Sequence, residues 1–194
     1  MKKREGYSLA NYYTKSVRLI IRPYQASDYQ TWLSAYRNRR PKQHKYDEGR
    51  LDMTVCTEEW FAAFTDKHQQ LINEDKAYVF GVFRLADGMH VGYVDFSTLL
   101  RDDFQWARMG YTIHNQFWRM GYGKEAVKAA IGLAFDQLNY HRLEAHINLD
   151  NHPSVKLAKS VGMEFECLRK GFLYENNEWA DHLVYYINND HFMA

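Results

Sequence analysis

The chain has 194 residues, of which 46% are hydrophobic, 25% charged and 16% aromatic. That length suits one domain with a sizeable core, and that composition excludes an intrinsically disordered chain. No segment approaches the roughly 18 to 20 consecutive apolar residues of a membrane-spanning helix, and the first residues lead into no apolar signal segment. We therefore expect a cytoplasmic protein.

Cysteine and histidine usage gives no sign of a disulfide framework or a metal site. The two cysteines, Cys56 and Cys167, form no CxxC pair, which favours reduced structural thiols. The nine histidines are scattered, and only His141 and His146 lie near each other, without ligand spacing. We expect no metal.

The net charge of +1 conceals an asymmetry, because residues 1–50 hold 12 Lys/Arg against 4 Asp/Glu. The densest basic stretch runs from Arg37 to Lys45. It can face RNA or an acidic substrate, or it can be an ordinary solvated loop, and the sequence leaves both interpretations open.

The first half of the chain predicts a strand, two helices and an antiparallel group of strands. A strand over 18–22 precedes a helix with its N-cap at Ser27 or Asp28, and a second helix starts at Thr57. His68 lies on the apolar stripe of this second helix, so we expect it to be packed and not catalytic. Apolar runs over 78–83 and 91–96 predict a β-hairpin, followed by a strand over 106–113.

The second half predicts a parallel strand pair and a closing hairpin. A helix over 124–138 is followed by a strand over 142–149, and strand–helix–strand indicates parallel pairing. A short helix over 155–161 ends at Gly162, and strands near 165–172 and 182–187 complete the fold. We expect an N-terminal tail over residues 1–16 and a single α/β domain over residues 17–194.

Gly121-Tyr122-Gly123 lies directly before a helix start, where backbone N–H groups and the helix dipole favour an anion. A tight strand-to-helix turn explains the same residues. With Ala126 the pattern also fits the dinucleotide fingerprint GxGxxA, but seven residues separate Ile113 from Gly121, which argues against a nicotinamide enzyme. The nucleoside-triphosphate P-loop is excluded because Glu125 follows Lys124.

From Trp106 onward the sequence resembles the GCN5-related N-acetyltransferase (GNAT) superfamily, and within it the Rim-type ribosomal-protein alanine N-acetyltransferases. The matching stretches lie in the family's order and cover nearly the whole domain. They are residues 110–113, 117–126, 144–146, 150–151, Ser154 and 161–166. The resemblance implies a mixed, mostly antiparallel sheet flanked by helices and splayed at a central parallel strand pair. It also implies acetyl-CoA as cosubstrate.

The resemblance further implies which residues bind acetyl-CoA. Arg119, Met120, Gly121, Tyr122, Gly123 and Lys124 would form the pyrophosphate loop. Tyr111 and Ile113 would lie beside the pantetheine arm, with the Ile113 amide near the acetyl carbonyl as an oxyanion donor. Asn151 matches the family's coenzyme-contacting asparagine.

Ser154 stands where Rim-type enzymes place a serine near the sulfur, so we expect it to be the general acid. It can equally be a first-turn residue of the following helix. The family's tyrosine acid is absent, because its position is Ala158. The general base stays unassigned, because Arg108 fills the place of a common glutamate. Asp95, His114 and Glu59 are candidates, each with a structural or surface role as the alternative.

We expect transfer of acetyl to a primary amine, with a ribosomal-protein N-terminus as the acceptor that best fits the resemblance. An amino sugar, amino acid or polyamine stays open as the acceptor. The sequence is also compatible with a non-enzymatic acyl-CoA sensor or a nucleic-acid-binding module. It does not define the oligomeric state.

Overall fold

A computed structural model describes residues 12–191, and within them one eight-stranded sheet holds the order β1-β2-β3-β4-β5-β6-β8-β7. The strands are β1 (Thr14–Lys15), β2 (Leu19–Pro23), β3 (Ala77–Arg84), β4 (His90–Leu100), β5 (Trp106–Ile113), β6 (Arg142–Asn148), β7 (Glu164–Glu175) and β8 (Glu178–Asn188). Every neighbouring pair is antiparallel except β5 and β6, which are parallel. The predicted fold class is confirmed.

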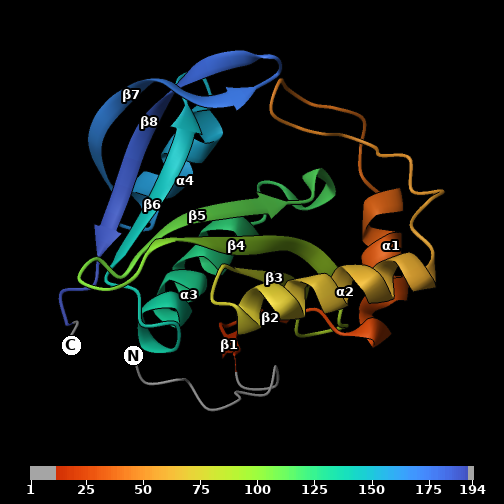
Figure 1. The fold of residues 1–194 in the computed structure, drawn as a ribbon. Helices are drawn as coiled ribbons and strands as arrows, with labels where there is room; N and C mark the ends of the chain where they lie inside the picture. The colour runs from red at the N-terminus through yellow and green to blue at the C-terminus, as the bar shows by residue number, and fades with distance from the viewer. Residues whose placement is uncertain (1–11, 192–194) are drawn as a thin grey trace.

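Within residues 12–191, four α-helices cover the two faces of this sheet (Figure 1). They are α1 (Tyr29–Arg37), α2 (Glu58–Asn73), α3 (Tyr122–Asp136) and α4 (His152–Ser160). A short 3-10 helix, Ala26–Asp28, precedes α1, and another, Asn115–Phe117, follows β5. Part of the segment expected as an N-terminal tail forms β1, which pairs with β2, while residues 1–11 lie outside the described residues.

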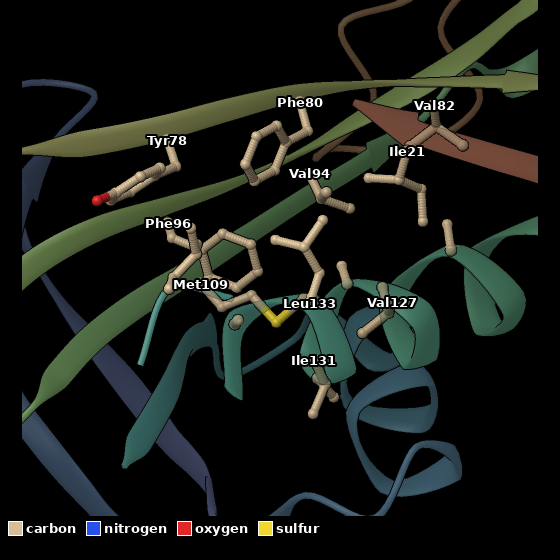
Figure 2. Packing of buried hydrophobic residues seen from close by; sticks show 14 of the residues in the cluster. Ile21, Tyr78, Phe80, Val82, Val94, Phe96, Met109, Val127, Ile131 and Leu133 are labelled. Carbon is tan, nitrogen blue, oxygen red and sulfur yellow. The ribbon is translucent and has the colours of Figure 1, made fainter. Parts of the chain in front are cut away.

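The main core lies between the sheet and α3 (Figure 2). Apolar side chains alternate along the strands, so β4 places Val94 and Phe96 on the α3 side, against Val127 and Leu133 of the helix. A smaller cluster packs α4 against β6 and β8 on the same side. α3 and α4 therefore cover one face of the sheet.

The opposite face packs against α1 and α2. Trp32 of α1 and Phe61 of α2 form an aromatic cluster with Tyr24 and Phe83. His68 contacts Phe64 within this layer at a ring distance of 4.1 Å, and burial lowers its pKa, as expected for a packed histidine. This face also presents Tyr93 and Asp95 of β4, because their neighbours Val94 and Phe96 point into the main core.

Two helices begin earlier than the sequence pattern predicts. α3 starts at Tyr122, after Gly121 as N-cap in the left-handed conformation with φ of 81°. α4 starts at His152 because the Asn151 side chain accepts from the Ser154 N–H and caps the helix. Ser154 therefore lies in the first turn of α4.

Candidate active site

The site forms where β5 and β6 separate. The two strands pair at three positions, the last between Arg108 and Glu144, although β5 continues to Ile113. The His114 N–H donates to the Val91 carbonyl of β4 at 2.9 Å, and strand residues alternate in direction, so Ile113 and Tyr111 direct their backbone polar groups toward β6. An extended ligand placed in this gap would continue the ladder.

The start of α3 lies beside this gap. A Cβ added at Gly123 would meet Ile113 Cγ1 of β5 at 3.7 Å and Leu157 Cδ2 of α4 at 3.4 Å. The first N–H groups of this 15-residue helix therefore open next to the end of β5. Backbone N–H groups at a helix N-terminus form an anion site.

The six residues expected to form the pyrophosphate loop differ in exposure. Arg119, with φ of 64°, is exposed, as are Met120, Gly121 and Lys124. Tyr122 is only 7% exposed and packs in the main core, so its backbone N–H, and not its ring, is suited to bind a ligand. The structure thus brings these residues together at the start of α3.

Tyr111 links β5 to α4 across the gap. Its hydroxyl donates to the Ser154 carbonyl at 3.2 Å, and burial raises the pKa of Tyr111 to about 12, so this phenol stays protonated. The Asn151 side-chain oxygen accepts from the Ser154 N–H at 3.3 Å, which leaves the Asn151 NH₂ group as a donor. Tyr111, Asn151 and Ser154 therefore lie together at one side of the gap.

Trp118 connects the end of β5 to the basic segment that follows α1. Its indole N–H donates to the Ile113 carbonyl at 2.6 Å, and its ring stacks on His44 at a centroid distance of 5.0 Å. The indole thus holds one of the polar groups that Ile113 directs into the gap. The Ile113 N–H faces the same way on the strand.

The sequence matches the family profile described as "Acetyltransferase (GNAT) domain" over residues 18–164. The chain belongs to the GNAT acetyltransferase family. It is an acyltransferase, with an N-acetyltransferase fold.

Three relatives show how this GNAT acetyltransferase compares with known proteins. It is 26% identical to Bacillus subtilis "Probable N-acetyltransferase YjcK", over 90% of this chain and 96% of that one. It is also 26% identical to the Escherichia coli "[Ribosomal protein uS5]-alanine N-acetyltransferase", over 93% of this chain and 81% of that one. The structure of Mycobacterium smegmatis RimJ in complex with CoA-disulfide has a TM-score of 0.72 at 20% identity, over 91% and 84% of the two chains, and shows the shared fold.

The three base candidates of this GNAT acetyltransferase lie in very different surroundings. Glu59 is exposed on the first turn of α2, which is distant in sequence from the β5 and β6 residues that border the gap. His114 is fully buried and hydrogen-bonded to His90, and burial lowers the pKa of His114 to about 2. Asp95 is half-buried on β4, directly opposite Gly110 of β5.

Asp95 reaches across β5 because Gly110 has no side chain. A Cβ at Gly110 would lie 2.4 Å from Asp95 Oδ1, so the carboxylate occupies the space above that residue. Burial raises the pKa of Asp95, and the charge of Arg108 opposes the shift. Of the three candidates, only Asp95 has its side chain over β5. Its carboxylate lies at Gly110, two residues before Thr112 and three before Ile113.

The basic segment after α1 is a folded loop. Arg39 is 2% exposed and pairs with Asp47 at 3.3 Å and with Glu48 at 2.9 Å. Asn115 holds the backbone of this loop through the N–H and carbonyl of Arg40. Arg37, Arg40 and Lys42 are exposed. Arg39 therefore neither faces RNA or an acidic substrate nor lies in solvent, because it is a buried structural cation.

The same loop also reaches the far side of the gap. Lys45 pairs with Asp150 at 3.3 Å, and the Tyr46 hydroxyl donates to the same carboxylate. Asp150 directly precedes the Asn151 cap of α4. Figure 1 shows the segment between α1 and α2, in orange, running past the end of β5 toward the β7–β8 hairpin.

Two further findings concern residues 12–191 alone. No helix among them is both long and apolar enough to cross a membrane. No three His, Cys, Asp or Glu side chains among them gather into a group suited to a metal ion.

Sequence reasoning missed Trp118 and Arg18 as residues that contact the site. Arg18 hydrogen-bonds to Met120, 102 positions along the chain. Trp118 was part of the recognised motif, but its indole bond to Ile113 depends on the turn formed by residues 115–117. Only the position of aromatic Trp118 directly before the glycine loop offered a local signal.

Proposed function

We propose that this GNAT acetyltransferase transfers acetyl from acetyl-CoA to a primary amine, and that the acceptor is a protein N-terminal α-amine of the ribosomal-protein type. The observation that carries this proposal is the separation of β5 from β6 beside the N-terminus of α3. The acceptor class is supported by the similarity to the uS5-alanine N-acetyltransferase. A ribosomal acceptor implies a cytoplasmic reaction, and the one continuous sheet supports a single domain over residues 17–194.

The residues around the gap fit acetyl-CoA. The backbone N–H groups of residues 119–124 suit the diphosphate, since an anion is favoured at the start of α3. The backbone groups that Tyr111 and Ile113 direct toward β6 suit the amides of the pantetheine arm. The Asn151 NH₂ group supplies a further donor beside the arm.

The chemistry requires a neutral amine, a site for the oxyanion and a proton for the leaving thiolate. The amine nitrogen attacks the thioester carbon, and the oxygen takes up negative charge near the Ile113 N–H. The C–S bond then breaks, and the Ser154 hydroxyl gives its proton to the thiolate sulfur. The amine loses its proton, through water, to the Asp95 carboxylate, and solvent then returns a proton to Ser154 and takes up the one on Asp95.

This assignment of Asp95 agrees with the demands of an α-amine. Such an amine has a reference pKa of about 8, so part of it is already neutral at physiological pH and a modest base suffices. Burial raises the pKa of Asp95 toward that of the amine, which favours proton transfer relative to an ordinary aspartate.

The test is acetyl-CoA binding followed by acceptor-dependent thiol release. Isothermal titration with acetyl-CoA, with NAD as the control, precedes an assay with two matched peptides that start with alanine and differ only in N-terminal acetylation. We expect binding of acetyl-CoA, and thiol release with the free N-terminus only. Release with spermidine or glucosamine but neither peptide would indicate a small-molecule acceptor. Binding without any release would indicate an acyl-CoA sensor, and no binding would refute the proposal.

A further inference from the structure

The loop before α3 can direct either N–H groups or carbonyls toward a bound anion. Because the loop contains glycine, the two orientations of its peptide differ little in conformational free energy. Gly121 has a left-handed φ of 81°, and Arg119, two residues earlier, has φ of 64°. Because glycine populates both signs of φ easily, the chain itself does not fix the peptide between Met120 and Gly121. Some other group must hold it.

Arg18, directly before β2, contacts this peptide. Its Nη1 donates to the Met120 carbonyl at 3.0 Å, and its Nη2 lies 3.3 Å from the position of a Cβ on Gly121. Its guanidinium also stacks on the Tyr122 ring, 4.4 Å from the centroid. The arginine therefore spans the turn that leads into α3.

A trans peptide directs its C=O and N–H in opposite directions, and the described chain has no cis peptide bond. With the Met120 carbonyl turned toward Arg18, the Gly121 N–H must point away from Arg18. A flipped peptide would instead direct the carbonyl, with its partial negative charge, to that side. Arg18 precedes β2, which lies three strands from β5 in the sheet, so the Gly121 N–H that points away from Arg18 is held on the side of the gap, where a donor suits an anion.

Glu125 fixes Arg18 in turn. Its carboxylate accepts from Arg18 Nε and from the Arg18 backbone N–H, both at 2.7 Å, and from the Ser16 hydroxyl at 2.8 Å. A carboxylate on the first turn of α3 would repel a bound diphosphate if it were unpaired. Its ion pair with Arg18, at 2.7 Å, offsets that charge.

We propose that Arg18 is a positioning residue that holds the Met120–Gly121 peptide in the orientation that binds the acetyl-CoA diphosphate. This inference rests on the proposed function, since it assumes that the diphosphate binds at residues 119–124. Arg18 touches none of the reacting atoms. Its loss should weaken acetyl-CoA binding and leave the chemical step intact.

The experiment compares wild type with Arg18→Met, using two acetyl donors. Acetyl-CoA has the diphosphate, whereas S-acetyl-N-acetylcysteamine has only the thioester end of the pantetheine arm. We expect Arg18→Met to raise KM for acetyl-CoA about tenfold, the factor that loss of one charge-assisted hydrogen bond produces, with kcat within about twofold. With the short donor, the two proteins should have the same KM. Lys128→Met, which removes an exposed cation one turn along α3, is the charge-matched control and should resemble wild type.

The amide signal of Gly121 distinguishes positioning from direct contact with phosphate. In ligand-free protein labelled with ¹⁵N, Arg18→Met should broaden this signal through exchange, because the peptide then moves between two orientations. A Gly121 signal that stays as sharp as in wild type, together with a raised KM, would show a direct phosphate contact and overturn the proposal. An unchanged KM for acetyl-CoA, or an equal rise in KM with both donors, would also overturn the proposal.

Failure of the proposed function is a separate outcome. If wild type binds no acetyl-CoA, the proposed function fails, while the Gly121 amide signal still reports whether Arg18 holds the peptide.

Discussion

Replacing Gly110 with alanine should move the carboxylate of Asp95 without removing it. The added Cβ would lie 2.4 Å from Asp95 Oδ1, whereas ordinary contact begins at 3.4 Å. The carboxylate must therefore retreat by the difference, about 1 Å, because Gly110 and Asp95 are held opposite each other in the β4–β5 ladder. A displacement of about 1 Å in a catalytic group costs about 100-fold in rate, or about 2.7 kcal/mol.

The assay is kcat from thiol release, with a thermal unfolding curve of the same sample to confirm the fold. We expect Gly110→Ala to lower kcat about 100-fold and Asp95→Asn by about 100- to 10,000-fold, the usual range for a general base. The double variant should have a kcat less than about threefold below that of Asp95→Asn alone, because both changes act through one carboxylate.

Two results would refute this reasoning. A folded Gly110→Ala protein with wild-type kcat would show that Asp95 is not the base. A further 100-fold loss in the double variant would show that the methyl group acts on β5 itself, for example by displacing the acetyl group.

Three further predictions concern the leaving group, the basic loop and acid stability. Ser154→Ala should lower kcat about 100-fold with acetyl-CoA affinity unchanged by titration, and unchanged kcat would exclude it as the acid. Arg39→Met should lower the free energy of unfolding by about 3 to 5 kcal/mol, since it breaks a buried ion pair, while exposed Arg40→Met should change urea unfolding little. His90 and His114 are buried, and burial lowers their pKa to about 3 and about 2. A histidine in the unfolded chain has a pKa of about 6.5 and takes up a proton below that pH, whereas the buried histidines stay neutral. The free energy of unfolding should therefore be fully present above about pH 6.5. Below it, this free energy should fall by up to about 1.4 kcal/mol per pH unit for each histidine. Equal urea midpoints at pH 7.5 and 5.5 would contradict this.

The glycine turn and the parallel strand pair at the proposed coenzyme site were largely predictable because their signals are local. Gly121 and Gly123 mark the start of α3 by position alone, and strand–helix–strand order required a parallel pair at β5 and β6. The sequence prediction was wrong about the first residues of α3 and α4. α4 begins at His152, three residues before the apolar stripe, because a cap is set by the Asn151 side chain and not by hydrophobic spacing.

The part of the site formed by Asp95 and the loop after α1 was less predictable because its contacts join distant parts of the chain. Asp95 gains access to β5 through the cross-strand register that places it opposite Gly110, and no periodicity along either strand reveals a register. By composition the Arg37 to Lys45 segment could be a solvated loop or a surface for RNA or an acidic substrate, yet Asn115 binds its backbone from 75 positions away. A buried arginine and an exposed one look alike in sequence until their partners are known.

The loop after α1 therefore has two attachments with different consequences for acceptor choice. Arg39 and Asp47, joined to each other and held by Asn115, are all buried, so this part of the loop should stay in place whatever the substrate. The stretch between them reaches Asp150 through Lys45 and Tyr46, a contact between exposed or half-exposed side chains that adds little stability. We propose that the acceptor enters past Tyr46. It can then displace the contact with Asp150 at small cost, whereas displacing the buried contacts of Arg39 and Asp47 would require unfolding the loop. Acceptor selectivity should thus depend on residues near position 46 more than on the basic residues at the start of the loop.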